Sequence, residues 1–257
     1  MQVGIFKDAD AIAQYAADVI AQRWQREPAG VLGLATGSSP EPTYQALIAK
    51  QKAGEVSFAK ARAFTLDEYV GLPAGHPESY REVIRNAFTR HVDFDDSAVQ
   101  SPDGLATDPD AACARYEEAI KAAGGVDLQI LGIGSNGHIA FNEPGESLVS
   151  RTHVGVLTSQ TRQDNARFFD GDIDQVPTHC MTQGLGTIME ASKLLLIATG
   201  EGKAEAVHHL VEGAVSSSWP ATIMQFHTDA LVLIDEAAAS RLETADRLRE
   251  LWEAAHS

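Results

Sequence analysis

VLGLATGSSPEPTYQALIAK, residues 31–50, is the stretch that decides the fold. Residues 31–35 are apolar and uncharged, which is typical of a strand buried on both faces of a parallel sheet. A short polar loop, TGSSP, follows, and residues 41–50 then show a helical pattern. The stretch therefore predicts a strand, a loop and a helix in direct succession.

The same alternation continues on both sides of this unit. Strands are expected at 61–66, 127–134, 193–200 and 230–235, and helices after Asp8, near 78–90, near 110–123, around 203–212 and from 239 to about 254. Such an order is typical of an α/β fold in which helices cover a doubly wound, mostly parallel sheet. A (β/α)8 barrel of about 250 residues is the alternative, but the chain has too few clear strands for it. No repeat or low-complexity linker divides the chain, so we expect one domain over residues 1–257.

Composition narrows the possible partners. The 257 residues include 36 acidic and 20 basic side chains, a net charge of −16, without a Lys/Arg-rich run. Such a surface repels phosphate backbones, so we expect no nucleic-acid or anionic-membrane partner, and an anionic ligand needs a local positive site. Cys113 and Cys180 form no C-x-x-C pair, which fits a reducing compartment. No signal peptide or membrane span is evident, so a cytoplasmic location is expected.

Ligands of parallel sheets collect at the carboxyl ends of strands, so the loop after the first strand is a candidate site. Thr36, Gly37, Ser38 and Ser39 precede Pro40 there, and the amide groups of such a loop can bind an anion. The loop is not a Walker A motif, because no G-K-[ST] follows. An ordinary capped turn is the alternative interpretation.

Two adjacent carboxylates, Asp67 and Glu68, follow the next strand. A carboxylate at such a strand end is a candidate general base. The alternative is a solvated strand end or a helix cap.

The segment LGIGSNGHIAFNEPG, residues 131–145, contains Gly132, Gly134 and Gly137 in the order G-x-G-x-x-G. This order suggests a dinucleotide-binding loop, but that motif needs a helix opening at its third glycine. Residues 142–145, NEPG, interrupt any helix, and no acidic residue closes a strand about 20 residues later. A nicotinamide cofactor is therefore not expected.

The same loop presents Asn136, His138 and Glu143 from one short stretch. Histidine titrates near neutrality, and a nearby carboxylate fixes its tautomer, so His138 and Glu143 are candidates for proton transfer. A structural histidine is the alternative. No metal-ligand spacing surrounds His138, and no metal site is expected.

Three basic residues lie in loops near the later strands. Arg162 and Arg167 belong to TRQDNARFF, and Lys203 follows the strand at 193–200. In so acidic a chain they are candidates for the positive site that an anionic substrate requires. Solvated surface charges are the alternative.

Taken together, these segments resemble the glucosamine-6-phosphate deaminase (glucosamine-6-phosphate isomerase) family over nearly the whole chain. The resemblance implies a Rossmann-like sheet shared with sugar-phosphate isomerases and 6-phosphogluconolactonase. It also implies a cofactor-free enzyme of amino-sugar catabolism that converts glucosamine 6-phosphate and water to fructose 6-phosphate and ammonia. The matching strings are LATGSSPEPTY (34–44), LDEYVGLPAGHPESY (66–80), LGIGSNGHIAFNEPG (131–145), SRT (150–152), TRQDNARFF (161–169) and GEGKAEA (200–206).

The resemblance also implies roles for the matching residues. Asp67 would move a proton from carbon two to carbon one of the opened sugar, and His138, oriented by Glu143, would open the ring. Asn136 stands where one branch of the family has an aspartate, and an amide cannot take up a proton, so Asn136 is expected to orient His138 or the substrate. The residues implied around the phosphate are Thr36, Gly37, Ser38, Ser39, Arg167 and Lys203.

A second departure concerns regulation. Members activated by N-acetylglucosamine 6-phosphate have a hydroxyl and several basic residues where this chain has Glu146, His153, Gly155 and Val156. An acidic side chain repels a phosphate, so we predict no such activation. The family includes monomers and hexamers, and a monomer or small homo-oligomer is expected here.

Three other functions must be weighed. A 6-phosphogluconolactonase typically has a T-A-S-L-F-P-like run after the histidine, where this chain has IAFNEPG. A sugar-phosphate sensor that regulates transcription would add a DNA-binding segment, and none is seen. A catalytically silent sugar-phosphate binder stays open, as does a preference for the galactosamine isomer.

Overall fold

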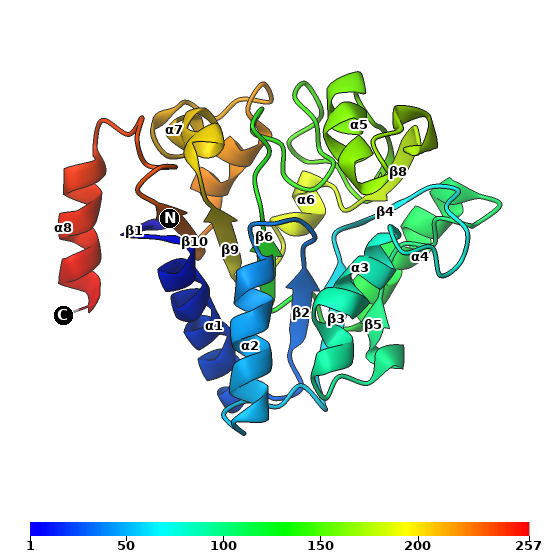
Figure 1. Cartoon of the computed structure of the whole chain (residues 1–257), viewed down its shortest axis with the longest axis horizontal. Coiled ribbons are helices and arrows are strands. Elements are labelled where there is room, and N and C mark those ends of the chain that lie inside the picture. The colour runs from blue at the N-terminus through cyan, green and yellow to red at the C-terminus, as the bar shows by residue number, and fades with distance from the viewer. Residues whose placement is uncertain (257) are drawn as a thin grey trace.

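The computed structural model describes residues 1–256, and a parallel sheet is its central element (Figure 1). Its strand order is β1-β10-β9-β6-β2-β3-β5, and every pair of neighbours is parallel. The predicted doubly wound α/β fold is thereby confirmed. The strands are β1 (Gln2–Phe6), β2 (Val31–Leu34), β3 (Arg62–Thr65), β5 (Val99–Gln100), β6 (Leu128–Leu131), β9 (Leu194–Ala198) and β10 (Ala230–Asp235).

Helices flank this sheet, and α1 and α2 lie side by side in front of it in Figure 1. Asp8 caps α1 as predicted, because its side chain accepts a hydrogen bond from the Ala11 amide at 2.8 Å. Across residues 1–256, none of the helices combines the length and the apolarity that a membrane span requires. The helices are α1 (Ala9–Arg26), α2 (Glu41–Lys52), α3 (Tyr80–Ala87), α4 (Pro109–Ala122), α5 (Ser159–Asn165), α6 (Leu185–Ile188), α7 (Ala204–Glu212) and α8 (Ala245–His256).

The last helix begins later than predicted. Residues 236–244 form turns, and α8 starts at Ala245 rather than near Ala239. Ala238 and Ala239 are buried against the core, so this stretch packs inward instead of starting an amphipathic helix. The helix α8 lies at the side of the molecule, beside the edge strand β1 (Figure 1).

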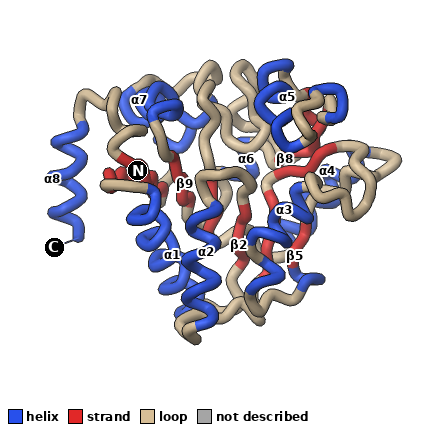
Figure 2. Tube along the Cα trace, viewed as in Figure 1, coloured by secondary structure: helices blue, strands red, loops and turns tan. Residues whose placement is uncertain are grey.

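A second, antiparallel sheet was not predicted. It consists of β4 (Asp67–Tyr69), β8 (His179–Thr182) and β7 (His153–Val156), in the order β4-β8-β7. The strand β4 has three residues, and β7 and β8 mix polar with apolar side chains, so none forms the apolar run by which the buried strands are recognised. In Figure 2, β8 lies below α5, and both are at the end of the molecule toward which the arrows of the main sheet point in Figure 1.

Four neighbouring strands of the main sheet, β9, β6, β2 and β3, lead into the candidate loops. Lys203 follows β9, the loop with His138 follows β6, the TGSSP loop follows β2, and Asp67 follows β3 after a single residue. Because these strands are parallel and adjacent, their carboxyl ends lie at one edge. The fold thereby gathers residues that are far apart in the sequence.

Candidate active site

Asp67 is the acid at the end of β3 and the first residue of β4. Its side chain is buried, with the residue 5% exposed, and within residues 1–256 nothing donates a hydrogen bond to its carboxyl group. Burial, and then the neighbouring charge of Glu68, raises the pKa of Asp67 well above its ordinary value. A buried carboxylate whose oxygens are unengaged is a strong proton acceptor once it is ionised.

Glu68, the adjacent acid, has a different task. Its carboxylate accepts hydrogen bonds from the amides of Tyr80 at 2.9 Å and Arg81 at 3.0 Å, the first two residues of α3. Successive residues of a strand face opposite sides, so the two acids separate although they are neighbours in sequence. Glu68 is therefore the helix cap that was the alternative for this pair, and Asp67 alone stays a candidate base.

Asn136, His138 and Glu143 are brought together by the loop after β6. The Asn136 amide Nδ2 donates to Glu143 Oε2 at 2.9 Å, and Asn136 Oδ1 accepts from the His138 amide at 3.2 Å. His138 Nδ1 lies 3.9 Å from Glu143 Oε2, and it is buried without a hydrogen-bond partner among the described residues. Asn136 thus orients both members of the pair.

The glycines of this loop make room for the imidazole rather than for a dinucleotide. A Cβ atom on Gly134 would lie 2.3 Å from the His138 ring, and Gly137 has a φ of +83° with Trp219 packed behind it. Residues 135–145 form turns and bends, so no helix opens at Gly137. The expectation that no dinucleotide motif is present agrees with this geometry.

The electrostatic environment of His138 favours the neutral ring. Burial lowers its pKa, and the positive charge of Lys203 acts in the same direction, whereas Glu143 opposes both. A neutral imidazole can accept a proton at one nitrogen and donate one at the other, which a ring-opening proton shuttle needs.

Thr161 joins this group, and the sequence analysis did not select it. Its hydroxyl donates to Glu143 Oε1 at 2.5 Å from the buried face of α5. Asn165, at the end of the same helix, donates from Nδ2 to the Tyr69 hydroxyl at 2.8 Å, beside Asp67. The only available signal was that both residues lie in the TRQDNARFF string, in which only the basic residues indicated a function.

Of the three basic candidates, two form no ion pair with an acid among the described residues. Arg167 is exposed in the turn after α5, with its guanidinium 4.7 Å from the centre of the Phe168 ring. Lys203 is half-buried before α7, and burial followed by the charge of Arg167 lowers its pKa. Neither forms an ion pair within residues 1–256, so an anion placed between them would relieve their repulsion.

Arg162 does not belong to this positive site. Its guanidinium donates to the backbone carbonyls of Ile173 at 2.7 Å and Val176 at 3.1 Å. Those bonds fasten the turn after α5, so Arg162 has a structural role.

The TGSSP loop leaves the start of α2 without a side-chain cap. Pro40 occupies the cap position, Gly37 has a φ of +105°, and Ser38 is exposed. No hydroxyl of Thr36, Ser38 or Ser39 forms a hydrogen bond to the rest of residues 1–256, so the ordinary capped turn does not describe this loop. Its hydroxyls and amides are free to meet an anion.

The described part of the chain contains no group of three or more His, Cys, Asp or Glu side chains that could hold a metal ion.

The site combines a free buried carboxylate, a histidine–carboxylate pair and two cations that form no ion pair among the described residues. Together they define an α/β enzyme of acid–base type for a small anionic substrate. The chain belongs to the family described as glucosamine-6-phosphate isomerases/6-phosphogluconolactonase, whose model matches residues 7–233.

Relatives within this family cover almost the whole chain. A glucosamine-6-phosphate deaminase of Mycolicibacterium smegmatis is 64% identical over 254 residues, 99% of this chain and 97% of that protein. A protein of the same name from Streptomyces coelicolor is 54% identical over 252 residues, 98% of this chain and 97% of that protein.

Solved structures show the same fold. One described as a monomeric glucosamine-6-phosphate deaminase has a TM-score of 0.91 and 44% identity, covering 93% of this chain and 99% of that one. The 6-phosphogluconolactonase of Trypanosoma brucei has a TM-score of 0.74 at 19% identity, covering 94% of this chain and 98% of that one. The latter likeness extends to the fold alone.

Proposed function

We propose that this enzyme converts glucosamine 6-phosphate and water to fructose 6-phosphate and ammonia, in the breakdown of amino sugars. The observation that carries the proposal is the Asp67 carboxylate, which is buried and unengaged at the edge where the other candidate residues gather. Relatives of that name, more than half identical to this chain over nearly its full length, support the choice of substrate.

The reaction would begin at His138. The sugar phosphate exists mainly as a ring, and opening it requires a proton to leave the anomeric hydroxyl and a proton to reach the ring oxygen. His138 would carry both transfers in its neutral form, which burial favours. Glu143 would stabilise the imidazolium that forms in between, and Asn136 would keep Glu143 in place through its 2.9 Å hydrogen bond.

Asp67 would perform the isomerisation. It would take the proton from carbon two of the open-chain amino aldehyde, whose carbonyl oxygen gains a proton as the enolamine forms. It would then return its proton to carbon one, which leaves a protonated imine at carbon two and a hydroxyl group at carbon one. Water adds to that imine, and loss of ammonia gives the ketone of fructose 6-phosphate. One group must both accept and donate the proton, and the raised pKa of Asp67 makes its carboxylate a stronger proton acceptor than an ordinary aspartate.

Arg167, Lys203 and the loop from Thr36 to Ser39 would hold the phosphate. They follow strands at the carboxyl-terminal side of the sheet, and neither cation forms an ion pair among residues 1–256, although the charge of Asp164 acts on Lys203. They would supply the local positive site that a chain of net charge −16 needs for an anionic substrate.

We also propose that the chain acts as one catalytic domain over residues 1–257, in the cytoplasm, as a monomer or small homo-oligomer, without a nucleic-acid or membrane partner. The 44% identical structure described as monomeric supports the low oligomeric state.

The test is to supply purified protein with glucosamine 6-phosphate and measure ammonia and fructose 6-phosphate together. 6-Phosphogluconolactone and galactosamine 6-phosphate serve as parallel substrates. Equal release of both products from glucosamine 6-phosphate is the expected result. Hydrolysis of the lactone without deamination would replace the proposal by the lactonase function, and binding without turnover would leave a sugar-phosphate binder.

A further inference from the structure

Thr161 is a buried hydroxyl that none of the proposed chemical steps uses, although it contacts the acid–base pair directly. The residue is 7% exposed, and its Oγ1 lies 2.5 Å from Glu143 Oε1 and 2.9 Å from the hydroxyl of Thr158, the cap residue of α5. A carboxylate can only accept, so Thr161 must donate its single proton to Glu143. Thr158 then donates to Thr161, and the two hydroxyls form a directed chain that ends on Glu143.

This chain fixes one oxygen of the Glu143 carboxylate, while Asn136 fixes the other. Oε1 accepts from Thr161 and Oε2 accepts from Asn136 at 2.9 Å, which leaves His138 Nδ1 3.9 Å from Oε2. At that separation the imidazole and the carboxylate are not hydrogen-bonded. The strength of their interaction therefore depends on where the two donors hold the carboxylate.

The helix that carries Thr161 also contacts the other parts of the site. Asn165 at its end donates to the Tyr69 hydroxyl at 2.8 Å, and Arg167 lies in the turn that follows. The Thr161 hydroxyl is thus the contact through which α5 sets the geometry of the His138–Glu143 pair.

We infer that Thr161 is a positioning residue for the His138–Glu143 pair, whose hydroxyl holds Glu143 at the orientation that proton transfer requires. The inference rests on the proposed function for its kinetic consequence. Its electrostatic consequence, on the titration of His138, is independent of turnover.

Two variants separate the hydroxyl from the bulk of the side chain. Thr161→Val keeps the branched shape and removes the donor, whereas Thr161→Ser keeps the donor. The exposed Thr178 in a nearby loop offers Thr178→Val as a matched control. If Thr161→Val does not fold, Thr161→Ala removes the hydroxyl without adding a methyl group at its place.

The first measurement is kcat and KM with glucosamine 6-phosphate. We expect Thr161→Val to lower kcat about 10-fold or more, the usual scale for a lost hydrogen bond to a charged group, with KM changed far less. Thr161→Ser and Thr178→Val should keep kcat within about two-fold of the wild-type value. Wild-type kcat in Thr161→Val, or equal losses in the Ser and Val variants, would overturn the inference.

The second measurement is the NMR titration of the His138 ring, assigned with His138→Gln and recorded without substrate. Without the Thr161 donor, the charge of Glu143 acts more strongly on the imidazolium, so the pKa of His138 should rise in Thr161→Val and stay at the wild-type value in Thr161→Ser. An unchanged or lowered pKa would overturn the inference. If the wild-type protein releases no ammonia, the proposed function fails, and this titration still decides the role of Thr161.

Discussion

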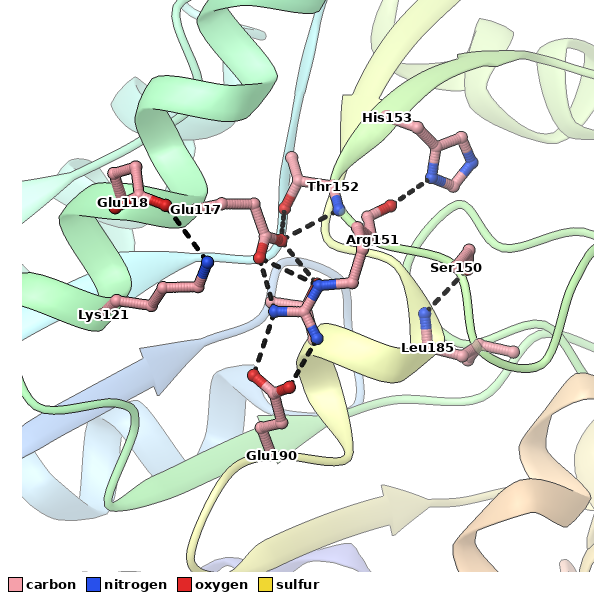
Figure 3. Close-up of polar contacts among 10 residues, drawn as sticks. Glu117, Glu118, Lys121, Ser150, Arg151, Thr152, His153, Leu185 and Glu190 are labelled. Atoms are coloured by element: carbon pink, nitrogen blue, oxygen red, sulfur yellow. Dashed lines mark hydrogen bonds and ion pairs between the residues drawn. The ribbon is translucent and has the colours of Figure 1, made fainter.

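Glu117 and Asp67 are both buried acids, but their surroundings differ in one decisive respect. The Glu117 carboxylate accepts from the Thr152 amide at 2.9 Å, from the Thr152 hydroxyl at 2.5 Å and from Arg151 Nη2 at 2.5 Å (Figure 3). It also accepts from the Thr187 hydroxyl at 2.5 Å. These bonds join α4, the segment before β7, and α6. The Asp67 carboxyl group, within residues 1–256, accepts no such bond.

The difference appears in the two acidities. Burial alone would raise the pKa of Glu117, but its hydrogen bonds to Thr152, Thr187 and Arg151 more than offset this, so its pKa lies below the ordinary value. Burial raises the pKa of Asp67, and nothing offsets it. Hydrogen-bond satisfaction, rather than burial, therefore distinguishes the structural acid from the candidate catalytic one in this protein.

The largest expected effect comes from replacing the unsatisfied acid. Asp67→Asn removes the proton acceptor and should lower kcat for deamination by about 10³- to 10⁴-fold. It also removes a poorly stabilised buried charge, so the thermal midpoint should stay the same or rise. Ammonia release and thermal melting of the same preparation measure both. A variant that keeps normal turnover would remove Asp67 from the mechanism.

The satisfied acid should show the opposite pattern. Glu117→Gln removes the negative charge that pairs with Arg151 and replaces one accepting oxygen by an amide NH2 group, which cannot accept from Thr152 or Thr187. We therefore expect a loss of about 3–5 kcal/mol in the free energy of unfolding. The folded variant should keep kcat within about two-fold. Urea unfolding measures the loss, and the adjacent Glu118→Gln is the control. Glu118 is exposed, and its one ion pair within residues 1–256 is with Lys121 at 3.1 Å (Figure 3). Equal stability of both variants would contradict the structural role of Glu117.

Among the basic residues, the unpaired Lys203 contrasts with the paired Lys193 in the same way. Lys203→Met should raise KM for glucosamine 6-phosphate about 10- to 100-fold through the lost contact to phosphate. Lys193 pairs with Asp229 at 2.7 Å and precedes β9, at the opposite end of that strand, so Lys193→Met should leave KM unchanged. Steady-state kinetics at constant ionic strength compare the two. A KM that does not respond to Lys203→Met would place the phosphate elsewhere.

The pH dependence of stability sharpens the comparison of the two acids. The folded-state pKa of Asp67 is raised, so the penalty for its ionisation is absent at low pH. The penalty develops as pH rises above the unfolded pKa and is complete once pH has passed the folded pKa. Relative to wild type, Asp67→Asn should therefore gain stability as pH increases. The pKa of Glu117 is lowered, so its contribution is present above its unfolded value and is lost as pH falls through the folded value. The deficit of Glu117→Gln should therefore shrink in acid.

Urea unfolding of the wild type and both variants between about pH 3 and pH 8 measures these trends, because the Glu117 contribution is lost only below the ordinary pKa of a glutamate. The activity should follow Asp67 as well, with kcat/KM falling in acid at a pH above the ordinary titration of an aspartate. If the two stability differences changed with pH in the same direction, the contrast between the acids would be wrong.

Most of the parallel sheet and the main site residues could be predicted from the sequence. Buried strands appear in the sequence as apolar runs. Ligands of parallel sheets bind at the carboxyl ends of the strands, and this rule predicted that Asp67, His138 and the TGSSP loop lie at the same edge of the sheet. Thr161 and Glu117 could not be found in this way, because their importance depends on contacts across 18 and 35 residues of sequence. The short antiparallel strands were missed since β4, β7 and β8 lack a periodic apolar pattern.

The smallest expected effect concerns a third acid, Glu146, and is the absence of activation by N-acetylglucosamine 6-phosphate. It lies three residues after Glu143, and its Oε2 is 3.4 Å from His153 Nε2, while His153 Nδ1 lies 2.8 Å from the Arg151 carbonyl oxygen. Two acceptors flank this imidazole, and the nearby Glu146 carboxylate raises the pKa of His153, so the positive charge of a protonated His153 is already matched by Glu146.

An effector phosphate at this place would have to compete with Glu146 for His153, and Gly155 and Val156 of β7 offer no charge to help it. We therefore expect the half-saturation concentration for glucosamine 6-phosphate to be the same with and without N-acetylglucosamine 6-phosphate. Initial rates over a range of substrate measure this, and Glu146→Ser shows whether removal of the acid alone creates a response. A clear lowering of half-saturation in the wild-type enzyme would mean that an effector phosphate binds in spite of the carboxylate, or at another place. Comparison with Glu146→Ser would then decide between these two outcomes, because only a site beside Glu146 should bind more tightly once the carboxylate is gone.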